Sequence, residues 1–130
     1  MATGFPAVTG DVLSAAMYNG LVTFAVSTDS TAATYTAVLT DSYQVLQPIN
    51  SATATAFKIP TNASVAFAVG TVITVLNIGV GAVTISATTS ATTTILSAGT
   101  VAAQPTLAQY KSAACIKTAA NAWYIVGAIA

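Results

Sequence analysis

Residues 65–85 read VAFAVGTVITVLNIGVGAVTI and contain no charged side chain. Their length and hydropathy would suffice for a transmembrane helix, which needs about 20 apolar residues. However, β-branched residues dominate the stretch and favour strands, and no Lys or Arg cluster flanks it to set an orientation in a membrane. The residues that interrupt it, as turns would, are Gly70, Asn77, Gly79 and Gly81. The stretch therefore predicts a hairpin of two buried strands, residues 71–78 and 82–87.

The rest of the chain from about residue 31 has a hydropathy period of two, which is typical of strands. Turn signals recur roughly every 8–12 residues, as in sandwiches and barrels. Further strands are expected at residues 34–39, 43–47, 52–59, 92–96, 106–110, 113–117 and 122–129. The sequence therefore predicts an all-β fold, an antiparallel β-sandwich or jelly-roll-like domain over residues 31–130. No repeat with a fixed period of 20–50 residues is visible.

The last expected strand is apolar on both faces. Trp123, Ile125 and Ile129 alternate with Tyr124 and Val126. A strand of this kind belongs at the centre of a sheet or under cover on both sides.

Residues 1–30 are predicted to form an N-terminal arm with a short helix. Ser14 is a suitable N-cap. Met17, Leu21 and Phe24 fall at i, i+4 and i+7, on one face of a helix. Two readings of this arm stay open, a docking element for a partner and a helix that caps the chain's own core.

The charge content is far below that of ordinary soluble proteins. The chain has 130 residues, with three Lys, three Asp and no His, so charged residues make up 5% of it; the usual share is roughly 25%. A folded chain of 12.9 kDa exposes on the order of 6,000 Å², or roughly one charge per 1,000 Å². A net charge of zero also gives no repulsion between copies. We expect partners to cover much of the surface.

The same inventory argues against several classes of function. Three scattered Lys residues and no Arg cannot track a phosphate backbone, so neither nucleic acid nor an anionic membrane is an expected partner. Without His there is no Ser-His-Asp triad, no Cys-His pair and no imidazole metal ligand. The carboxylates Asp11, Asp29 and Asp41 show no spacing that predicts acid–base or Ca²⁺ chemistry. We expect no enzyme, no metal, no cofactor and no catalytic residues.

Weaker signals have structural explanations. Cys115, the only cysteine, is expected to be a small buried hydrophobic residue. The sequon Asn62-Ala63-Ser64 lies where a turn is expected, and no spacing supports a Lys–Asn crosslink. Tyr110, Trp123 and Tyr124 are expected in the core or an interface rather than in a sugar-binding site.

Several segments resemble a β-rich module of tailed-bacteriophage virion proteins. These segments are Asp41-Ser-Tyr-Gln-Val, Phe57-Lys-Ile-Pro-Thr-Asn-Ala-Ser-Val-Ala-Phe-Ala-Val-Gly-Thr-Val-Ile, Gly79-Val-Gly-Ala-Val-Thr-Ile, Ala108-Gln-Tyr110 and Ala120-Asn-Ala-Trp-Tyr-Ile-Val-Gly127. The opening Thr9-Gly-Asp-Val-Leu-Ser-Ala-Ala is similar to segments near the N-termini of phage fibre proteins. The chain departs from the module at residues 100–105, which replace a more basic segment, and after Gly127, where an acidic residue is usual. The shared pattern is a folding pattern, so it implies no functional residue.

The resemblance implies a non-enzymatic virion structural protein, made in the bacterial cytoplasm and located on the particle surface. Because the chain is a single short domain without a shaft, we expect a capsid cement or decoration subunit. Its expected partners are the major capsid protein or other virion proteins, and copies of itself in a dimer or trimer. One alternative is a tail-associated or short fibre protein that binds a host receptor.

An alternative of another class is an independent binding module, adhesin-like or ice-binding-like. Repeated Thr-x-Thr pairs motivate this reading, at Thr34/Thr36, Thr53/Thr55 and Thr92/Thr94.

Overall fold

The computed structural model describes residue 15 and residues 25–42 and 45–129 of the chain. Apart from one short 3₁₀ helix, the elements over residues 25–42 and 45–129 are all β-strands, joined by turns and loops. Its strands are β1 (Ala25–Val26), β2 (Thr34–Thr36), β3 (Val45–Ile49), β4 (Thr55–Ile59), β5 (Val72–Asn77), β6 (Val83–Ala87), β7 (Thr94–Ser97), β8 (Thr100–Val101), β9 (Thr106–Leu107), β10 (Ser112–Ala119) and β11 (Ala122–Gly127). One 3₁₀ helix, η1 (Leu39–Ser42), lies between β2 and β3. The all-β prediction is confirmed for these residues.

The predicted arm lies mostly outside the described residues. Ser14, Met17, Leu21 and Phe24 are all among the residues that the structure does not describe. Sheet pairing begins before residue 31, because β1 pairs with β3 and Ser30 bridges to Ile49. The predicted boundary between residues 1–30 and 31–130 stays a prediction.

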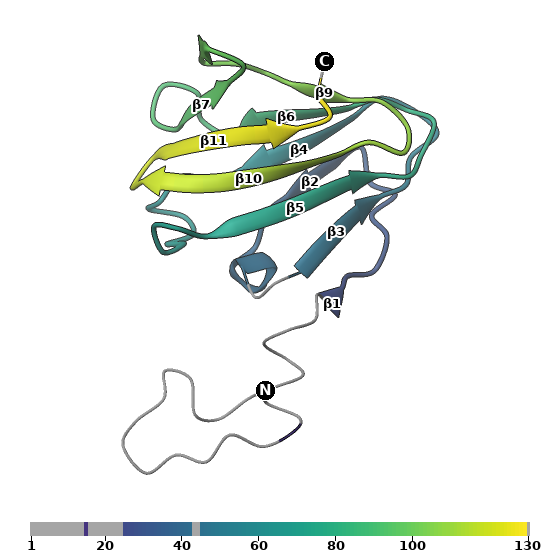
Figure 1. Cartoon of the computed structure of the whole chain (residues 1–130), viewed down its shortest axis with the longest axis horizontal. Coiled ribbons are helices and arrows are strands. Elements are labelled where there is room, and N and C mark those ends of the chain that lie inside the picture. Colours follow the sequence, from purple (N-terminus) through teal and green to yellow (C-terminus); the bar gives the residue numbers. More distant parts are fainter. Residues whose placement is uncertain (1–14, 16–24, 43–44, 130) are drawn as a thin grey trace.

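The strands form two mixed sheets that face each other (Figure 1). The seven-stranded sheet has the order β1-β3-β5-β10-β11-β7-β8, and the four-stranded sheet has the order β2-β4-β6-β9. The pairs β1–β3, β3–β5, β2–β4, β4–β6 and β7–β11 are parallel. The prediction of a purely antiparallel arrangement is therefore wrong.

The parallel pairs arise because the chain alternates between the two sheets. Strands β1, β3 and β5 belong to one sheet, while β2, β4 and β6 belong to the other. Leu46 pairs with Thr74 and Thr55 pairs with Val83, so the offset is 28 residues in both sheets (74 − 46 and 83 − 55). Strands β3 and β4 together form one coil, and β5 and β6 form the next coil stacked upon it. This repeat is structural and leaves no similarity between the two segments in the sequence.

Glycines permit the stacking of these coils at the corner where the chain changes sheets. A Cβ on Gly79 would lie 2.3 Å from the backbone N and O of Ser51, and one on Gly81 would lie 2.0 Å from the Thr53 O. The buried Asn77 fixes the same corner, because its Nδ2 donates to the O of Gly81 (2.8 Å) and to the O of Leu107 (2.9 Å). These glycines serve a close backbone approach between two corners.

The predicted hairpin of residues 71–78 and 82–87 is wrong for this reason. Both segments are strands, but β5 pairs with β3 and β10, whereas β6 pairs with β4 and β9 in the other sheet. The glycines between them were interpreted as a tight turn that returns the chain beside itself. They instead form a corner that carries the chain across the core.

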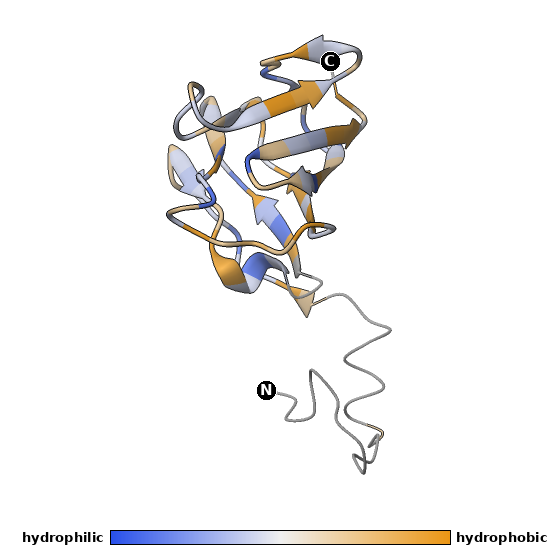
Figure 2. Cartoon of the chain, turned by 90° about the vertical axis from the view of Figure 1, so that its left-hand side faces the viewer, coloured by the Kyte–Doolittle hydropathy of each residue, from blue (hydrophilic) through white to orange (hydrophobic). Residues whose placement is uncertain are grey.

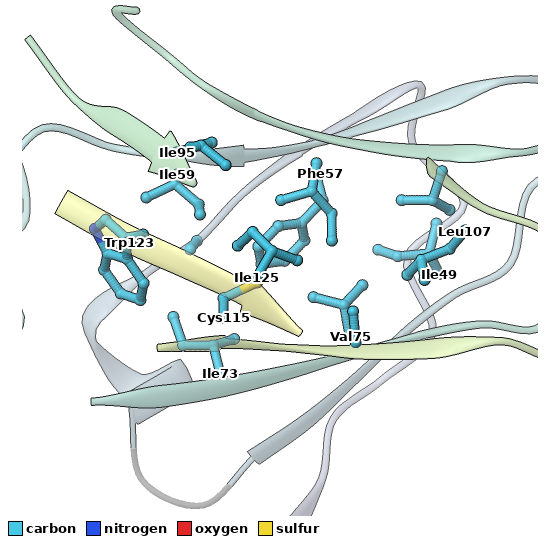
Figure 3. Packing of buried hydrophobic residues seen from close by; sticks show 14 of the residues in the cluster. Ile49, Phe57, Ile59, Ile73, Val75, Ile95, Leu107, Cys115, Trp123 and Ile125 are labelled. Carbon is cyan, nitrogen blue, oxygen red and sulfur yellow. The ribbon is translucent and has the colours of Figure 1, made fainter. Parts of the chain in front are cut away.

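The core lies between the inner faces of the two sheets (Figure 3). Ile73, Val75, Cys115 and Ile125 project from the seven-stranded sheet toward Phe57 of the four-stranded sheet, and all five are at most 2% exposed. Aromatic rings contribute at two points: Phe67 meets Trp123 edge to face with centroids 5.5 Å apart, and Tyr35 stacks on Phe57 at 5.6 Å. Strand β11 lies between β10 and β7, as its two apolar faces predict.

Candidate interaction surface

The outer face of the seven-stranded sheet is apolar and uncovered by any other layer of the described chain. The alternation that buries one face of each strand turns the other outward. We call this surface the apolar face, and its residues are Leu46, Val72, Thr74, Leu76, Thr94, Leu96, Val101, Ser112, Ala114, Ile116, Tyr124 and Val126. Figure 1 looks onto this face, and no helix or further sheet lies in front of it. None of its residues carries a charge.

A continuous apolar row crosses five strands of this face. The registers place Val72 beside Ile116, Ile116 beside Tyr124, Tyr124 beside Leu96, and Leu96 beside Val101. Tyr124 is 45% exposed and Val101 is 66% exposed. An apolar row that is contiguous across a sheet marks an interaction surface more strongly than single exposed apolar residues, which are common on soluble proteins.

The outer face of the four-stranded sheet has the opposite character. We call it the threonine face, and its residues are Thr34, Thr36, Ala56, Lys58, Thr84, Ser86 and Thr106. Hydroxyl groups and one ammonium group make this surface suited to water. Figure 2 shows the chain from the side, coloured by hydropathy. Few strongly hydrophilic residues are visible in this view, and several strands carry strongly hydrophobic residues.

A pocket of about 270 Å³ adjoins the threonine face. The residues that line it include Lys58, Ser86, Thr88, Ser90 and Gln104. Its lining is largely polar, and nothing in it points to one chemical class of ligand.

The edges of both sheets are short. The edge strands β1, β8 and β9 have two residues each, and β2 has three. Short edges offer few free backbone groups to an added strand, which is one way in which proteins avoid edge-to-edge pairing. Among the described residues, the face of the larger sheet is therefore a better candidate for association than its edges.

Lys117 is a buried cation at one end of the core. It is 2% exposed, and its Nζ donates to Asn62 Oδ1 and to the Phe67 O, both at 2.6 Å. Burial lowers the pKa of Lys117 from its ordinary value, because both acceptors are uncharged and do not compensate for lost hydration. Lys117 thus ties residues 62–67 to β10. The sequence offered no signal for this contact between residues 55 positions apart.

Asp29 and Asp41 make hydrogen bonds within the described chain. Asp41 is 3% exposed; it accepts hydrogen bonds from Tyr35 Oη (2.9 and 3.1 Å) and from the Val38 N–H (2.9 Å). Burial, followed by the hydrogen bond and charge of Asp41, raises the pKa of Tyr35. Asp29 receives a long contact of 3.4 Å from Asn50. Asp29 and Asp41 make these contacts with different residues, and Asp11 lies outside the described residues.

Other predicted residues separate into core and surface. Cys115 is fully buried, so the prediction of a small buried residue is confirmed, and this burial raises the pKa of its thiol to about 12. Trp123 is in the core, while Tyr124 is on the apolar face. Tyr110 is 76% exposed in a turn with φ 62°, an unusual conformation for a residue with a side chain. The three aromatics therefore do not form one sugar-binding platform.

The Thr-x-Thr pairs do not build a shared flat array. Thr34 and Thr36 are on the threonine face, whereas Thr55 is 4% exposed and points into the core. Thr94 is on the apolar face of the other sheet. An ice-binding surface would need these hydroxyls on one plane, so this reading gains no support.

Within the described ranges, no cluster of His, Cys, Asp or Glu could hold a metal ion, and no helix has the length and hydropathy for a membrane span. Comparison with protein-family models, curated proteins and solved structures finds no match for this chain.

The sequence interpretation missed the apolar face, although residues 72–76 and 114–116 offered a signal. Both segments place apolar side chains on the strand face that does not reach the core.

Proposed function

We propose that this chain is a non-enzymatic β-sandwich subunit of a tailed-bacteriophage particle, most specifically a cement or decoration subunit of the capsid. The observation that carries the proposal is the apolar face, a sheet surface without charge that crosses five strands in register. In water such a surface is unfavourable, at roughly 25 cal/mol per Å² of apolar area. Within an assembly, the same surface contributes to binding.

The remaining features agree with a structural role. Charged residues are 5% of the chain. Two of them, Asp41 and Lys117, are buried and make hydrogen bonds within the chain. The resemblance of residues 41–127 to phage virion modules is the reason for proposing a phage particle as the assembly. Strand edges are too short to make strand addition the main contact, so a face-to-face contact is the expected mode.

The test is to detect the chain in purified phage particles and to remove it. A cement subunit is expected in a fixed copy number per capsid, and particles without it should lose heat resistance while still adsorbing to cells. Particles that stay heat resistant but fail to adsorb would indicate the tail-associated alternative. Absence of the chain from intact particles would overturn the proposal.

A further inference from the structure

We propose that Lys117 and Asn62 join in an isopeptide bond, which ties strand β10 covalently to the segment of residues 61–67. The two residues are 55 positions apart in the sequence, and in the folded chain Lys117 Nζ lies 2.6 Å from Asn62 Oδ1. The hydrogen-bonded pair is the state before the reaction. The bond is a modification of the chain by its own residues, so it does not depend on the assembly to which the chain belongs.

The backbone holds both reacting groups in place. In β10 the Lys117 N–H donates to the Thr71 O (2.9 Å), and the Lys117 O accepts from the Gly70 N–H (2.8 Å). The Asn62 N–H donates to Asn121 Oδ1 (2.8 Å). With Nζ 2.6 Å from Oδ1 and a C=O bond of about 1.23 Å, Asn62 Cγ lies within about 3.8 Å of Nζ. This is close to the separation of about 3–3.5 Å at which bound groups are positioned to react.

The surroundings of Lys117 favour a neutral amine, the form that acts as a nucleophile. The side chain is 2% exposed, and the two acceptors of its Nζ, Asn62 Oδ1 and the Phe67 O, are uncharged. Burial lowers the pKa of Lys117 from its ordinary value, so the amine forms more readily than it does in water. Trp123 pairs with Lys117 across the sheet and packs on Phe67, which keeps competing water away.

The reaction balances without a further reactant. The neutral Lys117 Nζ attacks Asn62 Cγ, and the new C–N bond gives a tetrahedral intermediate. The bond between Cγ and Nδ2 then breaks, and Nδ2 leaves as ammonia after taking a proton from the attacking amine. The products are a secondary amide and one ammonia. Asn62 is only partly buried, so the ammonia escapes to solvent and the step becomes irreversible.

We expect a slow reaction, over hours to days. Among the described residues no hydrogen bond links a carboxylate to this pair, since Asp29 and Asp41 bond to other groups, so no carboxylate relays the proton. Ammonia nevertheless leaves asparagine during ordinary succinimide formation, where the nucleophile is a backbone nitrogen, which is weaker than an amine. The fixed positions of the two groups provide the high effective concentration that a reaction of this kind needs.

The first experiment follows the intact mass of the full chain from purification through several days in neutral buffer. The mass of the wild type should fall by one ammonia. Because succinimide formation also releases ammonia, a tryptic digest must locate the change. Trypsin should no longer cleave after residue 117, and one branched peptide should contain residues 59–111 and 112–130.

Variants of the two residues and of a neighbouring lysine provide the controls. Lys117→Met and Asn62→Ala should each keep their full mass, and circular dichroism shows that each is folded. The matched control Lys111→Met, which changes an exposed lysine, should lose ammonia as the wild type does. Wild type kept unfolded in urea should form no branched peptide, because only the fold brings the two side chains together.

The second experiment compares the thermal midpoints of freshly purified and incubated wild type. The bond closes a loop between residues 55 positions apart, so the incubated chain should melt roughly 10–20 °C higher. Incubation should not change the midpoint of Lys117→Met. Only the unreacted form has an amine at residue 117 that titrates, so the pH dependence that Lys117 gives to stability belongs to that form.

Three results would overturn the bond. The first is a folded wild type that keeps its full mass after several days. The second is a loss of ammonia that the digest assigns to another residue. The third is a loss of ammonia that persists in Lys117→Met, because it would come from a different asparagine. The branched peptide decides the question in the wild type even where a variant does not fold.

Discussion

The two outer faces of this molecule differ in chemistry although the strands beneath them are alike. Across the larger sheet, one row reads Val72, Ile116, Tyr124, Leu96 and Val101; across the smaller sheet, one reads Thr34, Ala56, Thr84 and Thr106. Val and Thr have the same shape and both favour strands, so folding alone does not require the difference. What differs is the expected neighbour, which is protein for one face and water for the other.

The largest predicted loss of stability concerns an inward and an outward position on the same strand. Ile125 and Val126 are neighbours on β11, but Ile125 is 2% exposed in the core while Val126 is 49% exposed on the apolar face. Ile125→Lys buries an unpaired charge, and we expect it to lose about 3–5 kcal/mol or to fail to fold. Val126→Lys should retain wild-type stability of the monomer.

Denaturant unfolding monitored by tryptophan fluorescence measures this difference, because Trp123 reports on the core. Equal losses of stability in the two variants would show that Val126 is not outward in the folded chain. That result would remove the basis for the apolar face.

Lys117 and Lys58 extend the comparison to charge. Burial lowers the pKa of folded Lys117, so between that value and the ordinary value of about 10.4 the unfolded chain binds more protons. Lys117 therefore makes the free energy of unfolding rise with pH across this window, while the buried thiol of Cys115, with its raised folded pKa, makes it fall above about pH 8.5. Lys117→Met should remove the rising contribution and so lower the slope relative to the wild type, whereas Lys58→Met, on the threonine face, should keep the wild-type slope.

The measurement is chemical denaturation at several pH values up to about 9.5. Above that range Tyr35 acts in the opposite direction: its raised folded pKa makes stability fall as the unfolded tyrosine ionises first. A slope in Lys117→Met equal to that of the wild type would contradict the assignment to this lysine.

The smallest predicted effect concerns the turn at which the apolar row ends. Ala98 (φ 50°) and Gly99 (φ 80°) join β7 to β8, and two successive positive φ angles define a type I′ turn. Asn is far better suited to this first position than Ala, so Ala98→Asn should stabilise the chain by about 0.5–1 kcal/mol. Gly99→Ala should destabilise it by a similar amount through backbone strain alone, because open space surrounds Gly99.

A shift in thermal midpoint checks the turn pair. Equal midpoints in the wild type and in both variants would contradict the assignment of a type I′ turn to these residues.

The β-structure of this chain followed from local sequence. Alternation with a period of two identified the strands at Thr55–Ile59 and Ala122–Gly127, and it placed Trp123 and Ile125 on one face of the last strand, which the structure buries. These features depend on each residue's own propensity and on the side of the strand to which it points, and both can be read from neighbours in the chain.

The pairing of the strands was decided only by the tertiary structure. Residues 71–78 and 82–87 were expected to pair as a hairpin with glycines at its turn. In the structure Gly79 and Gly81 instead lie against the backbone of residues 51–53, a contact that local sequence does not show. The buried contact of Lys117 with Asn62, which are 55 residues apart, was likewise out of reach.

The sequence by itself therefore determined that this chain forms strands and that it is poor in charged residues. Only the tertiary structure decided that the chain coils between two sheets, and that outward apolar residues from five strands align into one row. The reason is physical: a strand's propensity is local, whereas its register depends on packing and backbone contacts between residues far apart in the chain.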